Sequence, residues 1–284
     1  MLDASPLALT NVTRIIAPMR VFSSGIATGL VWLACFVLRN HAEEIRRAVP
    51  ANEVALVQEI RRAAPSDEVP PQKVPSDNIP GVIERGPDSE PCVALTLDAG
   101  SEAGPVPQML ETLRSRHIKI TFFVTGDFVA TYPDIVRQIA ADGHEFGNHS
   151  LTHPDLRKVS DMQIRHELEA TEQLLKLTTG KTTRPFFRPP YGEYDNRVLR
   201  LAQQHGYTTV CWSLDSLDSV GVSKSPRFLV ERITSRLGVN EVRGAIVLMH
   251  CDSNATATAL PVILDHFKSL KLDVVPLSRL LGAK

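Results

Sequence analysis

The sequence predicts an α/β fold in which a parallel sheet is covered or closed by helices. From Cys92 onward, apolar strand-like runs alternate with stretches that carry helix-capping signals, and this alternation is typical of parallel sheets. Roughly seven such strands favour an irregular (β/α)7-type barrel. Four clusters of polar residues each follow directly after an apolar run. In such barrels the functional groups gather at the carboxyl ends of the strands.

The composition narrows the possible function classes. The chain has 284 residues, of which 43% are hydrophobic and 22% are charged, and its formal net charge is -1. These values are those of a globular protein with enough apolar residues for a sizeable core. A near-zero net charge leaves no basic surface for nucleic acid, so we expect no nucleic-acid binding.

The cysteine pattern indicates free thiols. The four cysteines, Cys35, Cys92, Cys211 and Cys251, form no C-x-x-C pair. Cys35 lies in an apolar N-terminal segment, which leaves an odd number for the rest of the chain. We therefore expect buried thiols rather than a disulfide framework.

The N-terminal region predicts a membrane anchor. After a tail over residues 1–20, the run 21–38 contains no charged residue and lies between Arg20 and Arg39. It just reaches the length of a membrane-spanning helix. No small-residue cleavage site follows it, which favours an uncleaved anchor over a signal peptide. Arginines on both sides leave the orientation undecided.

Residues 39–85 predict a spacer. The segment Glu44–Pro50, EIRRAVP, recurs as Glu59–Pro65, EIRRAAP, and each copy reads as a short helix ended by proline. Four further prolines up to Pro80 indicate an extended, semi-rigid chain. A partner-binding segment is the alternative. Residues 86–284 form the predicted folded domain.

The elements of this domain follow in order. The predicted strands are Val93–Leu97, Lys119–Val124, Tyr207–Ser213, Gly244–Met249 and Asp273–Val275. The predicted helices are Pro105–Arg116, a helix capped by Thr131 that ends at Gly143, one from the capping box at Ser160 to about Leu177 with Gly180 beyond it, and Asp195–His205 closed by Gly206. Pro226 is placed in the first turn of a further helix.

Asp98 is the first candidate functional residue. It follows the apolar strand Val93–Leu97 and lies close to Gly100. A carboxylate at the end of a buried strand either caps the following segment or acts as a general base. The residue alone favours the cap, whereas the other clusters favour the base.

The densest cluster is the segment 143–153, GHEFGNHSLTH. A histidine pair four residues apart occurs often by chance, but neutral imidazoles at His149 and His153 also suit zinc, cobalt or nickel. Pro154 disfavours helical geometry at His153, so we expect both rings to extend from a turn. His144 lies on the predicted strand, and we expect it to be structural.

Two further clusters complete the set. Arg188 lies in the segment 186–192, FFRPPYG, whose prolines stiffen the loop. A solvated arginine is the alternative, and the flanking Phe and Pro residues argue against it. His250 ends an apolar strand, where it is either a satisfied core histidine or a functional group.

Together these clusters resemble the signature of the polysaccharide deacetylase (NodB-homology) family, the family 4 carbohydrate esterases. The resemblance covers residues 86–284. It implies an irregular (β/α) barrel and a metal-dependent enzyme that hydrolyses N-acetyl groups on a glycan and releases acetate. The implied substrate is peptidoglycan or another N-acetylhexosamine polymer, and an O-acetyl esterase is a variant of the same chemistry.

The resemblance also implies a role for each candidate. Asp98 matches the general base and Arg188 the group that orients it. His149 and His153 match the ligands of a divalent metal, expected to be zinc, with cobalt or nickel as alternatives. The remaining matches are His250 as general acid, Asp218 as the carboxylate that keeps it protonated, the Tyr191 N–H as oxyanion donor, and Pro190, Leu248 and Met249 on the substrate side. Leu248 and Met249 either line the pocket or pack beneath it.

Two positions depart from the family pattern. Ala99 stands where the family has a second Asp, so the third protein ligand of the metal is missing. Glu102 is a possible substitute. Ser219 stands where a Trp usually follows Asp218. The departures leave open a catalytically silent glycan-binding protein, and a deacylase of another acylated substrate is a further alternative.

The same resemblance bears on localisation and partners. The family's usual substrates favour a catalytic domain outside the cytoplasm, periplasmic or at the cell surface. We therefore expect two partners, a glycan substrate and the membrane, the latter through the N-terminal helix.

Overall fold

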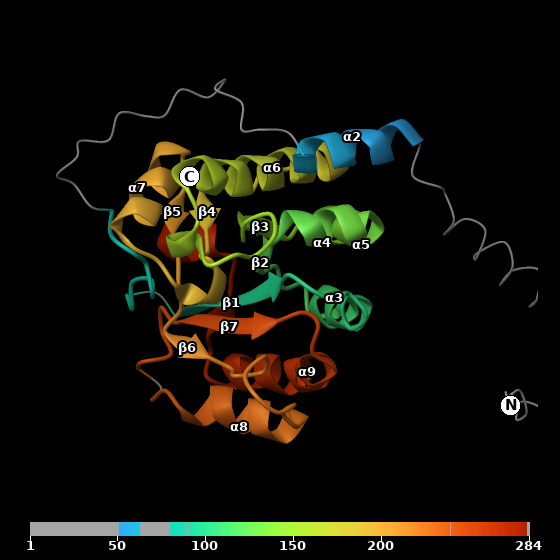
Figure 1. Cartoon of the computed structure of the whole chain (residues 1–284). Coiled ribbons are helices and arrows are strands. Elements are labelled where there is room, and N and C mark those ends of the chain that lie inside the picture. The colour runs from blue at the N-terminus through green and yellow to red at the C-terminus, as the bar shows by residue number, and fades with distance from the viewer. Residues whose placement is uncertain (1–50, 63–79, 90, 239, 283–284) are drawn as a thin grey trace, which may run out of the picture. The chain divides into compact units, whose positions relative to one another are not determined.

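The structure, a computed structural model, describes residues 51–62, 80–89, 91–238 and 240–282 (Figure 1). The predicted tail, the predicted membrane span 21–38 and most of the spacer therefore lie outside the described residues. Within the described ranges, no helix is both long enough and apolar enough to cross a membrane. The chain divides into two units, Met1–Ala51 and Asn52–Lys284, and all contacts discussed below lie within the second.

A parallel sheet forms the centre of the domain. Its strands are β1 (Cys92–Ala99), β2 (Thr121–Val124), β3 (Glu145–Asn148), β4 (Phe186–Phe187), β5 (Thr208–Thr209), β6 (Leu214–Asp215), β7 (Ile246–His250) and β8 (Asp273–Val274). The strand order is β5-β4-β3-β2-β1-β7-β6, with β8 paired to the start of β1. All strand pairings are parallel. The strands thus follow chain order around the sheet, which confirms the predicted α/β, (β/α)7-type architecture.

One segment joins the two edges of this sheet. β5 pairs with β4 and β6 pairs with β7, and only the four residues 210–213 separate β5 from β6. The sequence predicts a single strand over Tyr207–Ser213. The structure divides it because the segment leaves β4 partway and crosses to β7. The N–H of Val210 still donates to Phe187 (2.8 Å), whereas that of Ser213 donates to Ile246 (3.0 Å).

Residues before β1 complete this junction. Ile83 pairs in parallel with Val210, and Arg85 pairs in an antiparallel bridge with Ala245. The Arg85 guanidinium also donates to the carbonyls of Glu241 and Arg243. Residues 83 and 85, predicted to lie in the spacer, therefore belong to the folded domain.

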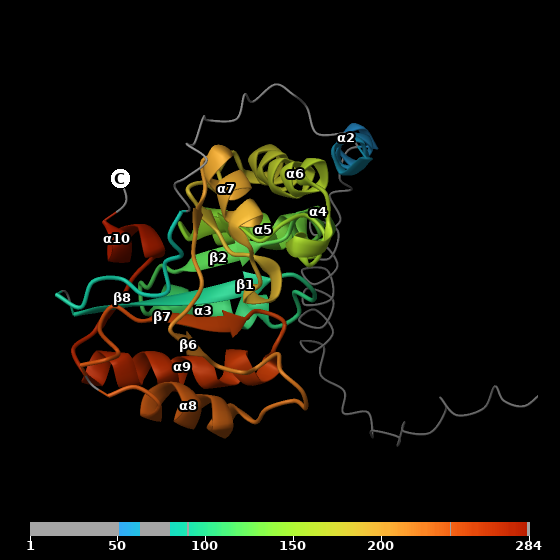
Figure 2. The same cartoon turned by 60° about the vertical axis from the view of Figure 1, so that its left-hand side comes forward.

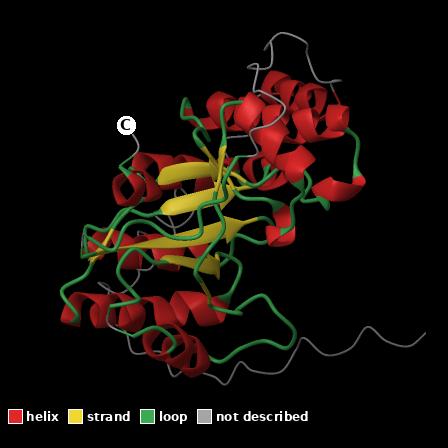
Figure 3. Cartoon of the chain, turned by 90° about the vertical axis from the view of Figure 1, so that its left-hand side faces the viewer, coloured by secondary structure: helices red, strands yellow, loops and turns green. Residues whose placement is uncertain are grey.

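Helices surround the sheet (Figures 1 and 3). They are α2 (Ala51–Arg62), α3 (Val106–Ser115), α4 (Gly126–Thr131), α5 (Pro133–Ala141), α6 (Asp161–Thr179), α7 (Asn196–Gln204), α8 (Pro226–Ser235), α9 (Asn254–Ser269) and α10 (Leu277–Leu281), with 3-10 turns η1 (Leu156–Lys158) and η2 (Pro190–Gly192). The predicted caps of α6 are present, since the Ser160 hydroxyl accepts from the Gln163 N–H and Gly180 has φ 71°.

Thr131 was wrongly assigned as a helix cap. It ends α4, and its hydroxyl donates to the carbonyl of Asp127 in the preceding turn. The next helix begins two residues later at Pro133, whose fixed φ suits the first helical turn. The short helix α4 has no counterpart in the sequence prediction.

The alternation of side chains along β1 and β7 separates the core from the site. Because successive residues of a strand point to opposite faces, Leu97 and Met249 enter the main hydrophobic core. Asp98 and His250, the adjacent residues, point to the other face. They are direct partners in the β1–β7 register and lie at the carboxyl ends of these two strands, which run side by side in Figure 2.

Candidate active site

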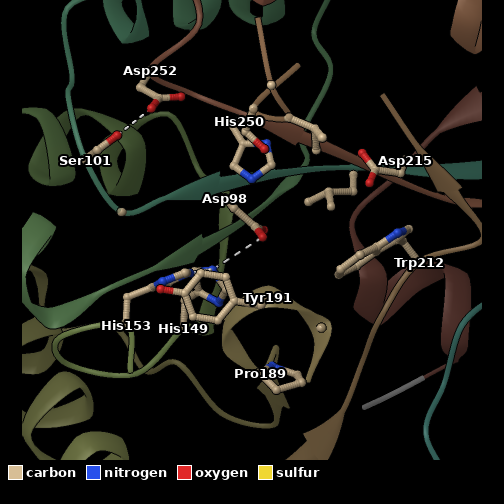
Figure 4. A pocket seen from close by; sticks show the side chains of 16 residues that line it. Asp98, Ser101, His149, His153, Pro189, Tyr191, Trp212, Asp215, His250 and Asp252 are labelled. Carbon is tan, nitrogen blue, oxygen red and sulfur yellow. Dashed lines mark hydrogen bonds and ion pairs between the residues drawn. The ribbon is translucent and has the colours of Figure 1, made fainter. Parts of the chain in front are cut away.

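A cavity of about 640 Å³ opens at the carboxyl ends of the strands (Figure 4). Its lining is formed by Asp98, Gly100, Ser101, His149, His153, Pro189, Tyr191, Gly192, Trp212, Asp215, Ser219, Val220, Gly221, Leu248, His250 and Asp252. Three of the four predicted clusters contribute reactive side chains directly to this surface. The fourth contributes Pro189, Tyr191 and Gly192, with Arg188 buried behind them.

Asp98 and Arg188 form a buried ion pair. The Arg188 Nη1 donates to Asp98 Oδ1 at 2.6 Å, and the side chains are 0% and 5% exposed. Burial would raise the pKa of Asp98, but the positive charge of Arg188 beside it and that of His250 across the pocket hold this pKa below its ordinary value. The carboxylate is therefore ionised at neutral pH.

Arg188 is fixed by contacts on every side of its guanidinium. Besides Asp98, its Nη1 donates to the Thr96 hydroxyl (2.9 Å), and its Nη2 donates to the carbonyl of Cys211 (3.2 Å). The guanidinium lies 4.0 Å from the ring centroid of Phe123 and 5.7 Å from that of Trp212. The planar fork of arginine suits this arrangement. These contacts allow little movement of the Asp98 carboxylate.

His149 and His153 converge at the end of β3. Their Nε2 atoms lie 3.2 Å apart, and the His149 Nε2 lies 3.5 Å from Asp98 Oδ2. The His149 Nδ1 donates to the Arg188 carbonyl (2.8 Å), which leaves the Nε2 lone pair free. Burial lowers the pKa of His149 to about 4 and also lowers the pKa of His153. Both rings are therefore neutral and can act as ligands.

His250 lies on the other side of Asp98 in Figure 4. Its Nδ1 donates to Asp218 Oδ1 at 2.7 Å, and its backbone N–H donates to Asp218 Oδ2 at 2.8 Å. The Thr256 hydroxyl donates to the same carboxylate (2.6 Å). Burial would lower the pKa of His250, but the hydrogen bond to Asp218 and the charges of Asp98, Asp218 and Asp252 raise it to about 9. The imidazole is therefore protonated at neutral pH.

Tyr191 lies in the turn η2 with φ 62°, in the left-handed region. The residue is 66% exposed, and its ring meets the His153 ring edge-on, with centroids 4.6 Å apart. Within the part of the chain that the structure describes, no acceptor is found for the Tyr191 N–H, which lies in the loop that edges the cavity. The next residue, Gly192, packs against the indole of Trp212.

The remaining predicted residues are placed differently. Leu248 lines the cavity, whereas Met249 is buried in the core and packs beneath it, as strand alternation requires. Pro190 is buried and is not part of the cavity lining, which contains Pro189 instead. Glu102, named above as a possible substitute ligand, is exposed and is not part of the cavity lining. His144 is buried and accepts from the Ile120 N–H, which is the structural role expected for it.

His149 and His153 are placed to supply two of the ligands of one divalent cation. Two nitrogens bound at their usual distance to one tetrahedral zinc lie about 3.3 Å apart, close to the observed separation of 3.2 Å. Across the described ranges, no cluster of three or more His, Cys, Asp or Glu side chains is arranged for metal binding. The Ala99 methyl is buried in the core and cannot ligate. Further ligands would be water, substrate or the nearby Asp98 carboxylate.

Comparison with known proteins places this site in a family. The sequence profile of the polysaccharide deacetylases matches residues 85–210. The solved structure of Bacillus subtilis PdaA, a family 4 carbohydrate esterase, has 31% identity and a TM-score of 0.64, and the match covers 70% of this chain and 84% of that one. The chain belongs to the polysaccharide deacetylase family.

The relatives of this chain include named deacetylases and a pseudoenzyme. The peptidoglycan-N-acetylglucosamine deacetylase of Bacillus cereus is 36% identical over 165 residues, which cover 58% of each protein. A family 4 pseudoenzyme from Bacillus anthracis has 29% identity and a TM-score of 0.66, covering 72% of this chain and 70% of that one. A mutant of that pseudoenzyme with restored enzymatic activity has the same TM-score. The match spans less than two thirds of the full-length Bacillus cereus protein.

Several residues of the polysaccharide deacetylase site were missed by sequence reasoning. They are Trp212, Asp215 and Asp252 in the cavity lining, Thr256 beneath Asp218, and Glu167 beneath the histidine turn. Asp252 lies two residues after His250, and this spacing was an available signal. In the sequence, Glu167 is one of several acidic residues of a predicted helix. Its contacts with the histidine turn are seen only in the structure, where α6 packs against that turn.

Proposed function

We propose that this polysaccharide deacetylase hydrolyses N-acetyl groups on a glycan, releases acetate, and depends on a divalent metal. The proposal is supported above all by one pair of side chains. Asp98 and His250 are neighbours in the sheet register and line the same cavity, yet their environments keep one ionised and the other protonated. Paired groups with opposite shifts are the arrangement that general base and general acid catalysis needs.

In the proposed reaction, Asp98 accepts a proton from the attacking water while Arg188 holds the carboxylate in place. The Tyr191 N–H donates to the oxygen that becomes negatively charged on the acetyl carbon. His250 then donates its proton to the departing amine, and Asp218 stabilises the imidazolium before that transfer. His149 and His153 would hold the metal, which when bound polarises the acetyl carbonyl and lowers the pKa of water.

The proposed substrate is peptidoglycan or another N-acetylhexosamine polymer. The names of the relatives support this class, since the Bacillus cereus protein is a peptidoglycan-N-acetylglucosamine deacetylase and a Bradyrhizobium relative, 33% identical over 158 residues, is a chitooligosaccharide deacetylase. The cavity is large enough for a sugar residue, and Tyr191 and Trp212 offer it aromatic surfaces.

A membrane-anchored localisation with the catalytic domain outside the cytoplasm is part of the proposal. It is supported by the uncharged run 21–38 and by the polymeric substrate class. The proposal predicts that the untreated chain fractionates with membranes. It also predicts that protease added to intact spheroplasts digests the domain. Protection of the domain from protease would contradict the proposed orientation.

A second candidate is a catalytically silent glycan-binding protein. Ala99 favours it, because the metal lacks an anionic ligand, and so does the similarity to a pseudoenzyme. Against it stands the geometry, since Asp98, His149, His153 and His250 meet around one cavity with suitable protonation states.

Acetate release from chito-oligosaccharides and peptidoglycan fragments distinguishes the candidates. The full chain would be assayed without metal and with zinc, cobalt or nickel, beside Asp98→Asn and His149→Ala. Metal-stimulated release that both substitutions abolish is the expected result. Glycan binding without release under any metal condition would establish the silent protein instead.

A further inference from the structure

The turn between the two metal-site histidines rests on a buried carboxylate from α6. Glu167 is 2% exposed. Its Oε2 accepts from the N–H groups of Leu151 and Thr152, both at 2.8 Å, and its Oε1 accepts from the Thr152 hydroxyl, also at 2.8 Å. All three donors belong to residues that lie between His149 and His153. The carboxylate thus holds the inside of the turn.

The turn has a backbone conformation that requires such support. Ser150 has φ 66° and His153 has φ 60°, so two residues with side chains occupy the left-handed region, which is unfavourable for L-residues other than glycine. The carbonyls of Ser150 and Leu151 accept from the first N–H groups of α4, each at 3.0 Å. The turn is thus bonded to α4 through its carbonyls and to Glu167 of α6 through its N–H groups.

The conformation matters because it sets the distance between the ligand atoms. His149 lies at the end of β3, where its ring is fixed by the Arg188 carbonyl. His153 lies beyond the end of β3, so the path of residues 150–152 determines where its ring lies. In this path the two Nε2 atoms are 3.2 Å apart.

We propose that Glu167 is a positioning residue for the metal site. By fixing the Leu151–Thr152 turn, it holds the His153 ring at the separation from His149 that one cation requires. This inference rests on the proposed metal-dependent function and deepens it. Partners that orient metal ligands without touching the metal affect affinity roughly 10- to 100-fold.

The same helix supplies a matched control. Glu172 is also buried, and it accepts from the Thr183 N–H (2.7 Å) and from the hydroxyls of Thr182 (2.7 Å) and Thr183 (2.6 Å). It therefore makes a similar set of bonds, but to the segment before β4 instead of the histidine turn. Loss of either carboxylate should loosen α6, whereas only loss of Glu167 should alter the metal site.

The test is the zinc affinity of the full chain, measured by competition with a chromogenic chelator. Glu167→Ala should weaken zinc binding roughly 10- to 100-fold. Glu167→Gln, whose amide can still accept from both N–H groups, should retain most of the affinity, and Glu172→Ala should bind as the unmodified chain does. In the metal-free protein, amide hydrogen exchange at Leu151 and Thr152 should be faster in Glu167→Ala.

Three results would overturn the inference. The first is an unchanged zinc affinity in Glu167→Ala, and the second is an equal loss in Glu172→Ala. If Glu167→Ala does not fold, Thr152→Val decides, because it removes one of the three bonds: weaker zinc binding supports the role, and unchanged binding, the third result, contradicts it. A failure of the unmodified chain to bind zinc, cobalt or nickel would instead overturn the proposed metal dependence together with this inference.

Discussion

At the scale of single residues, the chemistry depends on how two neighbouring groups are kept in opposite charge states. Asp98 and His250 share a cavity, and each contributes to the charge of the other. Arg188 stabilises the anion from one side and Asp218 stabilises the cation from the other. Since each charged group has its own buried counter-charge, neither needs the metal to reach its working protonation state.

The pH dependence of acetate release should report this arrangement. The pKa of His250 is raised from 6.5 to about 9, so the acid stays protonated until the pH rises through about 9, where activity should fall. Asp218→Asn should move this alkaline limb down by roughly one unit or more. Thr256→Val, which removes one uncharged donor to Asp218 and leaves the carboxylate in place, should move it little. An alkaline limb that is identical in Asp218→Asn and the unmodified chain would contradict the assignment.

The same shift predicts a pH-dependent stability. Because the folded-state pKa of His250 lies above the unfolded value, its contribution is complete below about pH 6.5 and is lost as the pH rises through about 9. Urea unfolding at pH 6 and pH 9.5 should show a smaller difference in Asp218→Asn than in the unmodified chain. An equal difference in both would show that the pair does not control stability in this range.

The buried Asp98–Arg188 pair should also stabilise the fold. Arg188→Met leaves the Asp98 carboxylate and the carbonyls of Val210 and Cys211 without their partner, so unfolding free energy should fall by about 3–5 kcal/mol. Arg114→Met is the control, since Arg114 pairs with Glu111 and Asp142 at the surface and exposed pairs contribute about 0–1 kcal/mol. Urea denaturation measures both. Equal losses of unfolding free energy in Arg188→Met and Arg114→Met would show that the buried pair stabilises the fold no more than the surface pairs do.

At the scale of elements, the turn η2 connects Tyr191, the proposed oxyanion donor, to the Trp212 indole. Gly192 has φ 70°, and a Cβ there would lie 2.7 Å from Cη2 of Trp212. Gly180 has φ 71° at the end of α6, and a Cβ there meets nothing within 4 Å. Both Gly→Ala substitutions should cost about 1–2 kcal/mol for the left-handed backbone.

Only Gly192→Ala should change catalysis, because Trp212 must move and η2 carries Tyr191. We expect a higher KM and a lower kcat for Gly192→Ala, with both constants unchanged for Gly180→Ala. Steady-state kinetics on chito-oligosaccharides measures this. Unchanged kinetics in Gly192→Ala would show that the Trp212 wall is not part of the substrate site.

The elements also show what sequence can predict. A long apolar run such as Val93–Leu97 predicts a strand that is buried on both faces. Its predicted bounds agree with those of β1 to within two residues at each end. β4, β5 and β6 have two residues each, which is too short for any periodicity. The helix at Pro133 was misplaced because Thr131 carries a capping signal that its position inside α4 overrides.

The residues of the site divide in the same way into those that a local sequence pattern predicts and those that it does not. Asp98, His149, His153, Arg188 and His250 were found because each follows an apolar run, and the structure brings them together around one cavity or directly behind it. Glu167 and Trp212 act through contacts with residues distant in the chain. No local pattern marks such residues, so the sequence could not have identified them.

At the scale of the whole molecule, the sheet is held together where its two edges meet. Ile83 donates to Thr209 (3.0 Å) and accepts from Cys211 (2.8 Å), and Gly86 donates to Gly244 (2.7 Å). The segment that carries Cys211 also accepts from Arg188. Residues 83–86 therefore connect the two edges of the sheet and also fix the segment whose Cys211 carbonyl accepts from Arg188.

A comparison of two truncated chains tests this support. A chain that begins at Pro87 should unfold at a temperature lower by several degrees than one that begins at Pro80, because it lacks the Ile83 and Arg85 pairings. Differential scanning calorimetry would measure both midpoints. Equal midpoints would show that residues 80–86 do not contribute to the stability of the domain.

We propose that the protein is an active, metal-dependent enzyme although Ala99 stands where the family resemblance implies an acidic metal ligand. The most direct test is the rate of acetate release as zinc, cobalt or nickel is titrated into the metal-free chain, with Ala99→Asp in parallel. We expect that release by the unmodified chain rises from zero and saturates, and that release by Ala99→Asp saturates at a lower metal concentration. An unmodified chain that releases no acetate at any metal concentration, beside an active Ala99→Asp variant, would contradict it.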